Sequence, residues 1–514
     1  MLIAQSLHRS GAGHPDKIAL MYRDQRISYS LLLNTTRSYA GLFQSLGIGR
    51  GDVVAICFEN SPEFVYAYYA LSWLGATVLP VNLLLTPKEI AYILGDCQAR
   101  AVVTRTEYWA KFAAAAAGGA LKVEKGFLVG GNPEPSTIET INISERLAYQ
   151  QPVSSDPEPV PQDSAAVLIY TSGTTGTPKG VMLSHHNLMS NADAVARATS
   201  ALDEDTFFLL LPVFHITSQT VCLLTPILIG AAIAIVSRID RAEMAHAFKE
   251  FLPTVFIAVP SIYNMLAAAP APPPDKNPVR LYVSGGAPLP SEIQNRFEAA
   301  YQKPIYGGYG LTEASPVVSW NVPGANKPVS VGKPLHGVQV KITNDKMEDL
   351  PAGEIGEICV KGELVMLGYY NRPEETSQTI IDGWLRTGDM GKIDTDGYLY
   401  VVDRKKEMLI YSGINVYPRE IEELLHTMPL ISEAAVVGVP DAARGEIPVA
   451  FVTSKAEKPV TERQIKEFCI ANLARYKVPR RFFVIDDFPR TASGKINKLQ
   501  LKAEAAHRMK EVAR

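Results

Sequence analysis

The sequence is poor in cysteine and has no long block of basic residues. Its five cysteines lie far apart and form no Cys-x-x-Cys pair, which argues against a disulfide framework and against a zinc site. The formal net charge is −3, which argues against a nucleic-acid-binding role. We therefore expect reduced thiols, a cytoplasmic location and no nucleic-acid partner.

The sequence also lacks a visible secretory signal, because His8-Arg9 ends the short apolar opening. One segment, 207–236, contains no Asp, Glu, Lys or Arg and is long enough to cross a bilayer. Pro212, Pro226 and Gly230 interrupt this segment. We expect it to form a buried strand, a loop, a helix and a second strand, and we expect no transmembrane segment in the chain.

At 514 residues the chain is too long for one hydrophobic core, so two or more domains are expected. In the first part, strand-like runs such as 53–57 alternate with helix-like runs such as 31–46 and 61–76. This alternation predicts an α/β domain of layered, mainly parallel sheets covered by helices.

The pattern changes near Asp403, where five consecutive charged residues, 403–407, are suited to an exposed hinge. From there the sequence predicts a small α+β domain of short strands and two helices, with a capping box of Thr461 and Gln464 before the second helix. The predicted strands are 408–411, 434–437, 448–452 and 482–485, and the predicted helices are 418–426 and 465–473. We expect a large N-terminal domain, 1–403, and a small C-terminal domain, 404–514.

The most informative stretch follows an apolar run, 165–170, and ends in a single lysine. Backbone amides in a tight Gly/Thr turn can form an anion-binding concavity, the hydroxyls add donors, and the lysine adds a point charge suited to phosphate. The alternative is a flexible surface loop, but a spacer would not need a lysine fixed behind a proline. The residues expected to hold phosphate are Thr171, Ser172, Gly173, Thr174, Thr175, Gly176 and Lys179.

This stretch differs from the common nucleoside-triphosphate loop, because Pro178 precedes the lysine and Gly180 follows it. It closely resembles the phosphate loop of the adenylate-forming superfamily, which includes acyl- and aryl-CoA ligases, peptide-synthetase adenylation domains and firefly-type luciferases. The resemblance implies ATP-dependent activation of a carboxylate, with ATP and acyl binding in 1–403 and a mobile lid in 404–514. The matched motifs extend to Lys495 in the family order.

Two further stretches resemble the nucleotide site of this superfamily. The string 306–313 contains Tyr309, which could stack on adenine, Gly310, Thr312, which could donate to the α-phosphate, and Glu313, which could hold Mg²⁺. Taken alone, the string could be a Gly-rich turn before a helix. The second stretch follows a predicted strand and resembles the adenine-side loop, through Gly285, Gly286, Ala287 and Pro288.

Asp389 follows a tight turn, and a carboxylate can accept two hydrogen bonds from a ribose diol, although a turn aspartate would look the same. By resemblance, Arg404 assists it. His215 ends an apolar strand, where a lone histidine is usually a core residue; the resemblance instead places it in the pocket for the substrate carboxylate. No acidic residue follows in 214–218, which disfavours an amino-acid substrate because its ammonium would lack a counter-charge.

The remaining assignments rest on the resemblance. Lys495 would swing into the site and bridge the carboxylate and the α-phosphate, while Lys406 would be the pivot of the small domain. Ser412 and Gly413 would contact the pantetheine of CoA in its tunnel. Many CoA ligases have two glycines in this loop where the chain has one, which makes the CoA contact less certain than the ATP site.

We therefore expect an AMP-forming acid–thiol ligase that uses ATP, Mg²⁺ and CoA. The candidate pocket segments, 216–225, 284–287 and 307–318, are uncharged apart from Glu313, which favours a medium- or long-chain fatty acid over aromatic or alicyclic acids. The alternatives are loading of a separate carrier protein, luciferase-type oxygenation, and a non-enzymatic acyl or nucleotide sensor. The oligomeric state stays open, a homodimer included.

Overall fold

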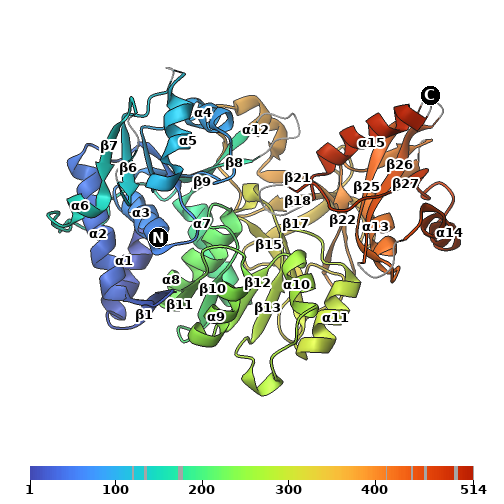
Figure 1. The fold of residues 1–514 in the computed structure, drawn as a ribbon, viewed down its shortest axis with the longest axis horizontal. Helices are drawn as coiled ribbons and strands as arrows, with labels where there is room; N and C mark the ends of the chain where they lie inside the picture. The colour runs from blue at the N-terminus through green and yellow to red at the C-terminus, as the bar shows by residue number, and fades with distance from the viewer. Residues whose placement is uncertain are drawn as a thin grey trace.

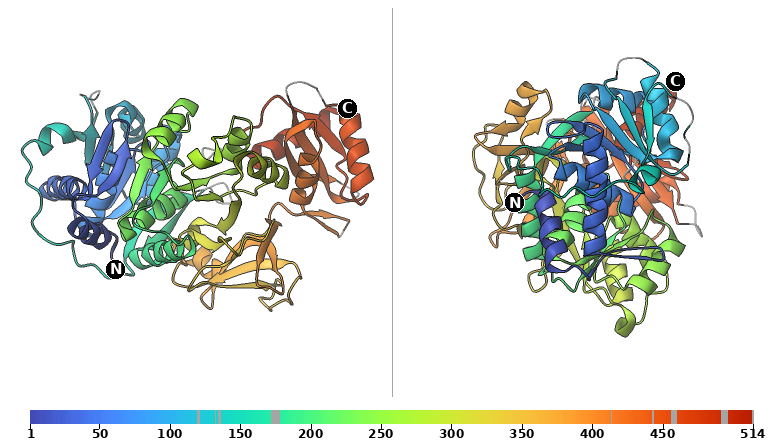
Figure 2. Two further views of the ribbon diagram at one scale, coloured as in Figure 1. Left: turned by 90° about the horizontal axis from the view of Figure 1, so that it is seen from below. Right: turned by 90° about the vertical axis from the view of Figure 1, so that its left-hand side faces the viewer.

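The structure is a computed structural model of the 514-residue chain. In Figure 1 the N-terminal helices and sheets form the larger part of the molecule, and the C-terminal residues form a smaller part beside it. The views in Figure 2 show the same division. The residues that the structure describes are 1–118, 121–131, 133, 136–171, 178–412, 414–441, 444–455, 460–490 and 496–512.

An eight-stranded sheet contains the predicted strand 53–57, which is β3 (Val53–Cys57). Its central strands are parallel, and β8 and β9 form an antiparallel pair at one side. The central strands are largely buried apolar runs, as expected of a sheet covered on both faces. In spatial order they are β19 (Gly368–Tyr369), β9 (Lys179–Ser184), β8 (Ala165–Thr171), β4 (Thr77–Pro80), β3, β5 (Ala101–Arg105), β6 (Lys125–Val129) and β7 (Glu139–Asn142).

A nine-stranded sheet carries the predicted adenine-side loop and the Gly-rich string. The uncharged segment 207–236 contributes its strands β10 and β11, separated by a π-helix, η1 (Ser218–Leu224), and by α8 (Thr225–Ile229), as predicted. No helix among the described residues is long and apolar enough to cross a membrane. In spatial order the strands are β16 (Lys333–Pro334), β15 (Val317–Trp320), β14 (Ile305–Gly310), β13 (Leu281–Ser284), β12 (Val255–Ala258), β10 (Thr206–Leu209), β11 (Ala232–Ile235), β1 (Ile18–Tyr22) and β2 (Gln25–Ser28).

Helices cover both sheets, and several begin where the sequence provides a cap. The Ser28 side chain accepts from the Leu31 amide at the start of α2, and Thr86 and Glu89 form a capping box on α4. Besides α8 and η1, the helices of this part are α1 (Ile3–Gly13), α2 (Tyr29–Ser45), α3 (Pro62–Trp73), α4 (Pro87–Asp96), α5 (Thr106–Ala116), α6 (Ile143–Leu147), α7 (His185–Ala198), α9 (Arg241–Phe251), α10 (Pro260–Ala267), η2 (Pro274–Lys276), α11 (Ser291–Tyr301), η3 (Thr312–Ala314) and α12 (Pro373–Thr379).

A third, antiparallel sheet leads to the small part. It contains β17 (Gln339–Thr343), β18 (Gly356–Lys361), β21 (Trp384–Ile393) and β20 (Ile380–Ile381), with β22 (Leu399–Arg404) paired to β21. The prediction that residues 403–407 form an exposed hinge is wrong for the first of them, Asp403. Asp403 is buried, because its carboxylate accepts the backbone amides of Arg404 at 2.7 Å and Arg419 at 3.0 Å.

The small part has its own sheet and two cores, which contain residues from Leu409 onward. The prediction of two helices is wrong, because a third, α15 (Lys498–Val512), is present. It is rich in strong helix formers and buries Leu501 and Ala505. The elements are β24 (Ile414–Val416), β23 (Leu409–Tyr411), β26 (Gly445–Ser454), β25 (Ile431–Asp441), β27 (Arg481–Val484), α13 (Pro418–His426) and α14 (Glu462–Asn472).

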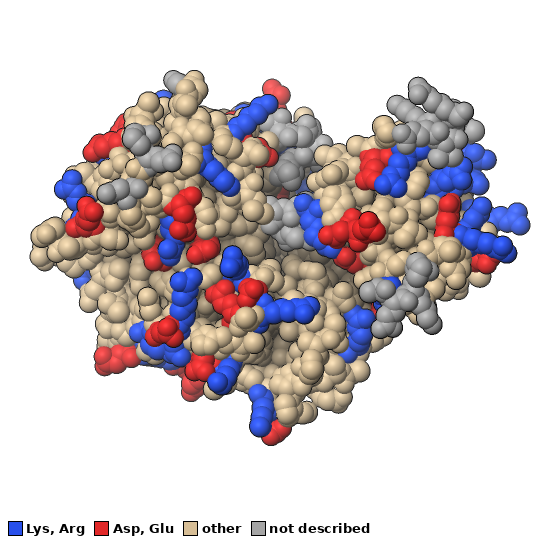
Figure 3. Space-filling model, viewed as in Figure 1, with Lys and Arg blue, Asp and Glu red and all other residues tan. Residues whose placement is uncertain are grey.

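These layers confirm the predicted fold class of a large α/β part and a small α+β part. The three cores of the large part contain residues up to Val401, so the packing changes between this residue and Leu409. The division at 403/404 stays a prediction that this separation of cores supports. On the face seen in Figure 3, charges of both signs are mixed, and a hollow separates the two parts.

Candidate functional site

The predicted adenine-side loop and the Gly-rich string lie together at the ends of neighbouring parallel strands. β13 and β14 pair in parallel with Ser284 opposite Gly307. A Cβ built on Gly285 would lie 3.8 Å from the Gly308 carbonyl oxygen, so the two loops are in contact. The carboxyl ends of parallel strands are where α/β sheets bind ligands.

The Gly-rich string turns sharply after β14. A Cβ on Gly310 would lie 1.9 Å from the Pro316 carbonyl oxygen, so only glycine fits where β14 and β15 approach each other. The Leu311 amide then donates to the same carbonyl at 3.0 Å. This turn places Thr312 and Glu313 in η3, directly after the strand.

Asp389 is the centre of a closely bonded corner of the site. The residue is 3% exposed, and its carboxylate accepts the Tyr309 hydroxyl at 2.6 Å and lies 2.8 Å from the Arg404 Nε. Burial raises the pKa of Asp389, while the charge of Arg404 opposes that rise. The sequence suggested each residue separately, but it did not predict that the Tyr309 hydroxyl bonds to Asp389, since 80 residues separate them.

Lys179 and Glu313 face a tyrosine that sequence reasoning missed. Lys179 begins β9, and its Nζ lies 5.2 Å from the ring centre of Tyr369 and 4.0 Å from a Glu375 carboxylate oxygen. The Tyr369 hydroxyl donates to Glu313 Oε1 at 3.0 Å. Only the pairing of β19 with β9 brings this tyrosine to the lysine, so no local sequence signal could have identified it.

Several predicted residues lie outside the described part of the chain: Ser172, Gly173, Thr174, Thr175, Gly176, Gly413 and Lys495. The two ends of the phosphate stretch are described. Thr171 on β8 is paired with Lys179 on β9, so the stretch begins and ends at the same point of the sheet.

His215 lies between β10 and η1. Its amide donates to the Pro212 carbonyl, and its ring centre lies 4.7 Å from that of Phe214. In η1, the Thr220 hydroxyl donates to the Ser315 carbonyl at 2.8 Å, two residues after Glu313. The proposed acid pocket and the proposed metal ligand are thereby held side by side.

Lys406, in the predicted hinge, is influenced by charged residues of the candidate nucleotide site. The pKa of Lys406 is lowered by partial burial and by the charge of Arg404, against the opposing influence of Asp389 and Glu313. Ser412 has a left-handed backbone, with φ of 47°, and its amide donates to the Arg444 carbonyl at 2.7 Å. Lys406 therefore lies within the field of the candidate nucleotide site.

Among the described residues no three His, Cys, Asp or Glu side chains form a metal-binding group. Glu313 offers one carboxylate, with Oε1 bonded to Tyr369. Mg²⁺ in nucleotide sites is commonly held by one or two carboxylates together with phosphate oxygens and water, so a single glutamate fits this ion.

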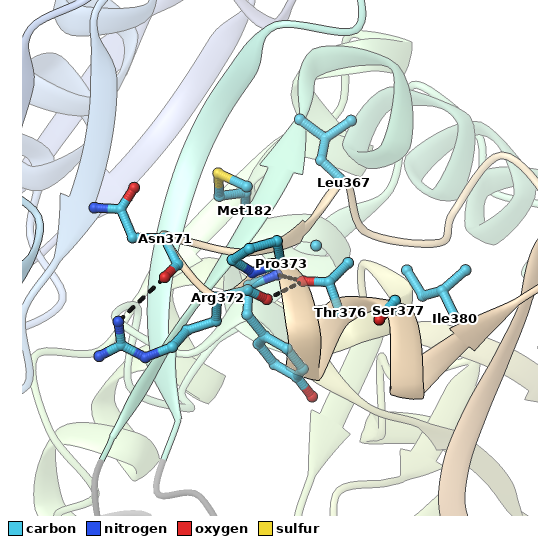
Figure 4. Close-up of a pocket in the computed structure, with 10 residues that line it drawn as sticks. Met182, Leu367, Asn371, Arg372, Pro373, Thr376, Ser377 and Ile380 are labelled. Carbon is cyan, nitrogen blue, oxygen red and sulfur yellow. Dashed lines mark hydrogen bonds between the residues drawn. The ribbon is translucent and has the colours of Figure 1, made fainter.

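A cavity of about 560 Å³ lies beside the Lys179 strand and outside the three predicted pocket segments. Figure 4 shows Met182 and Leu367 on one side of it and the residues of α12 on the other. Its lining consists of Met182, Leu367, Gly368, Tyr369, Asn371, Arg372, Pro373, Thr376, Ser377 and Ile380.

Two family models match the chain. The AMP-binding enzyme model matches residues 7–370, and the model of the AMP-binding enzyme C-terminal domain matches residues 420–495. Among curated proteins, a long-chain-fatty-acid–CoA ligase of Bacillus subtilis (strain 168) is 34% identical, with 96% of this chain and 93% of the relative covered. The 4-coumarate–CoA ligase CCL1 of Humulus lupulus is 35% identical, with 93% and 89% covered.

Solved structures agree with these relatives. The anthranilate CoA ligase AuaEII in complex with anthranoyl-AMP superposes with a TM-score of 0.90 at 29% identity, covering 98% of this chain and 97% of the other. The o-succinylbenzoate CoA synthetase MenE of Bacillus subtilis, in complex with ATP and magnesium, superposes with a TM-score of 0.83 at 29% identity, covering 97% and 99%.

Proposed function

The chain belongs to the AMP-binding enzyme family and is an AMP-forming acyl-CoA synthetase, and we propose that it activates a medium- or long-chain fatty acid. In the first step a carboxylate oxygen attacks the α-phosphorus of ATP, the bond to the β-phosphate oxygen breaks, and pyrophosphate leaves. In the second step the CoA sulfur attacks the acyl carbon of the acyl-adenylate, its proton is lost to solvent, and AMP leaves.

The proposed roles follow the geometry of the site. Asp389, held by Tyr309 and Arg404, would accept the ribose hydroxyls, and the ring of Tyr309 would lie against adenine. Lys179 and Thr312 would contact phosphates. Mg²⁺, held by Glu313 and phosphate oxygens, would neutralise charge on the triphosphate when bound.

Lys495 would stabilise charge at the α-phosphate, and His215 would line the acid pocket. The small part, 404–514, would turn about Lys406 between the two steps so that Ser412 and Gly413 approach CoA. Preorganised donors of the Lys495 kind are commonly worth about 3 kcal/mol of barrier.

The substrate proposal is carried by one observation, the lack of charge in the segments around the acid site. η1 is buried along its whole length and contains no charged residue. A carboxylic acid with a second charge would have no partner there. The fatty-acid ligase of Bacillus subtilis, with 34% identity over 96% of this chain, supports an aliphatic acid.

An aromatic acid is the second candidate, supported by the similarity to the 4-coumarate and anthranilate ligases. Loading of a separate carrier protein would use the same first step and differ only in the thiol. We also propose a cytoplasmic location, where ATP and CoA are available.

The test is a panel of acids assayed for pyrophosphate release and for thioester formation with free CoA. Each buried methylene contributes about 0.8 kcal/mol, so acids of roughly eight to sixteen carbons should have higher kcat/KM than shorter ones. A strong preference for 4-coumarate or benzoates would replace the fatty acid by an aryl acid. Adenylate formation without any thioester on CoA would indicate a carrier-protein thiol.

A further inference from the structure

Tyr369 stands between two groups that the proposed function assigns to the nucleotide phosphates. Its hydroxyl donates to Glu313 Oε1 at 3.0 Å, and its ring lies 5.2 Å from the Lys179 Nζ. The lysine and the glutamate come from segments more than a hundred positions apart in the sequence, and β19 brings the tyrosine to both.

The backbone of Tyr369 is fixed on both sides. Tyr369 is paired with Val181 in the β19–β9 ladder, two positions from Lys179. Its amide donates to the Thr376 hydroxyl at 2.9 Å, and that hydroxyl donates to the Arg372 carbonyl at 2.8 Å, as the bonds at Thr376 in Figure 4 show. The side chain therefore starts from a rigid position, which is the condition for orienting a neighbour.

The Tyr369 hydroxyl acts as a donor toward Glu313. An ionised carboxylate only accepts hydrogen bonds, so the proton of this bond comes from the phenol. A bond to Oε1 restricts rotation of the carboxylate and leaves Oε2 available. Partners of this kind orient metal ligands and typically change metal affinity by about 10- to 100-fold when they are removed.

The ring of Tyr369 acts on Lys179. A lysine and a glutamate at one phosphate site attract each other, and a direct ion pair would occupy both groups. Within the described part of the chain, the carboxylate paired with Lys179 is that of Glu375, at 4.0 Å, and no pair with Glu313 is formed. An ammonium near an aromatic face is attracted by the negative face of the ring, which adds to the Glu375 pair in holding Lys179 in place.

We propose that Tyr369 is a positioning residue of the nucleotide site. Its hydroxyl fixes Glu313 toward a nucleotide-bound Mg²⁺, and its ring holds Lys179 apart from Glu313 and ready for phosphate. This role rests on the proposed function, since it requires a magnesium nucleotide at the site.

The test measures ATP binding by calorimetry, with Mg²⁺ and with EDTA, for the unaltered protein and two variants. Tyr369→Phe removes only the hydroxyl, so ATP affinity should fall about 10-fold in Mg²⁺ and stay within twofold in EDTA. Tyr369→Leu also removes the ring beside Lys179, so affinity should fall in both conditions. Tyr370→Phe is the matched control, because its hydroxyl is one position away in sequence and is not assigned to the site.

The outcomes distinguish a failure of the Tyr369 role from a failure of the proposed function. If Tyr369→Phe binds magnesium ATP as well as the unaltered protein, or loses equally with and without Mg²⁺, the positioning role is wrong. If Tyr369→Leu behaves like Tyr369→Phe in EDTA, the ring does not hold Lys179. If the unaltered protein binds no ATP, the proposed function fails and this role fails with it. Thermal melting of each variant identifies losses due to unfolding.

Discussion

Two buried carboxylates lie one step apart on paired strands, and their surroundings differ. In the β21–β22 ladder Asp389 is opposite Arg404, and Met390 is opposite Asp403. Both aspartates are buried, and burial raises the pKa of each. Asp389 is bonded to the side chains of Tyr309 and Arg404, whereas Asp403 accepts the backbone amides of Arg404 and Arg419.

The difference follows from strand geometry. Successive side chains of a strand point to opposite faces, so Asp403 and Arg404 on β22 face opposite sides. Arg404 faces the nucleotide corner, and Asp403 faces the small part, where Lys498 lies near it. Side-chain partners can rearrange when a ligand arrives, whereas amide donors fixed in a strand and a helix cannot. Asp389 is therefore suited to binding and Asp403 to holding the two parts together.

The largest effect is expected from Asp389→Asn. The amide keeps the shape but removes the charge that pairs with Arg404 and that, in the proposed role, strengthens hydrogen bonds to the ribose. A hydrogen bond to a charged group contributes about 1.5–3 kcal/mol, so ATP affinity should fall roughly 10- to 100-fold. Calorimetric titration with magnesium ATP measures the change.

The matched variant on the neighbouring strand is Asp403→Asn, which should bind ATP within about twofold of the unaltered protein, because both bonds of Asp403 are to backbone amides and its side chain faces away from the nucleotide corner. The asparagine oxygen keeps one of these two bonds. Equal losses of ATP affinity in the two variants would mean that the two aspartates do not differ in role.

A smaller effect, on stability, is expected from Lys498→Met. The Lys498 Nζ lies 2.8 Å from a Glu422 oxygen and 3.0 Å from a Glu407 oxygen, at the junction of α15, α13 and the hinge. Burial acts to lower the pKa of Lys498, but the charges of Glu422 and Glu407 raise it. Loss of this cation leaves two partly buried carboxylates together, which should reduce the free energy of unfolding by about 2–3 kcal/mol.

Urea unfolding measures this loss, with Lys502→Met as the control on the same helix. Lys502 pairs with Glu446 at 3.4 Å, and its side chain is 47% exposed. An exposed pair contributes at most about 1 kcal/mol, so this variant should be nearly unchanged. Similar losses in both variants would show that helix α15, and not the ion cluster, determines the stability.

The sequence predicted what local patterns encode. The apolar run 53–57 and the Pro-initiated helix 418–426 have the predicted bounds in β3 and α13. The Gly-rich string is predicted to belong to the nucleotide site, and the close contact of Gly310 with Pro316 gives a steric reason for its glycine. The assigned roles of the site residues stay predictions.

The contacts within the site that the sequence did not predict depend on the pairing of strands that are far apart in the chain. The bond from Tyr309 to Asp389 joins β14 to β21, and Tyr369 reaches Lys179 only through the β19–β9 ladder. Asp403 was predicted to be exposed because it begins a run of five charges. It is buried because a strand alternates its faces, and the amide of Arg419 on α13 completes its hydrogen bonds.

The smallest effect concerns the pH dependence of Asp403. Burial raises the pKa of Asp403 from 3.8 to about 6. The folded protein thus holds this proton more tightly than the unfolded chain, and the resulting stabilisation is present at low pH and lost as pH rises through about 6. Asp403→Asn has no such proton, so the variant should gain about 1 kcal/mol relative to the unaltered protein between about pH 5 and 8.

The measurement is urea unfolding of both proteins across this pH range, and the difference between them cancels the groups that they share. A gap that widens with pH assigns the proton to Asp403. Parallel curves would mean that the amides of Arg404 and Arg419, together with nearby Lys498, keep the carboxylate ionised. The two aspartates would then differ only in their hydrogen-bond partners, and the burial of Asp403 would not make the stability depend on pH in this range.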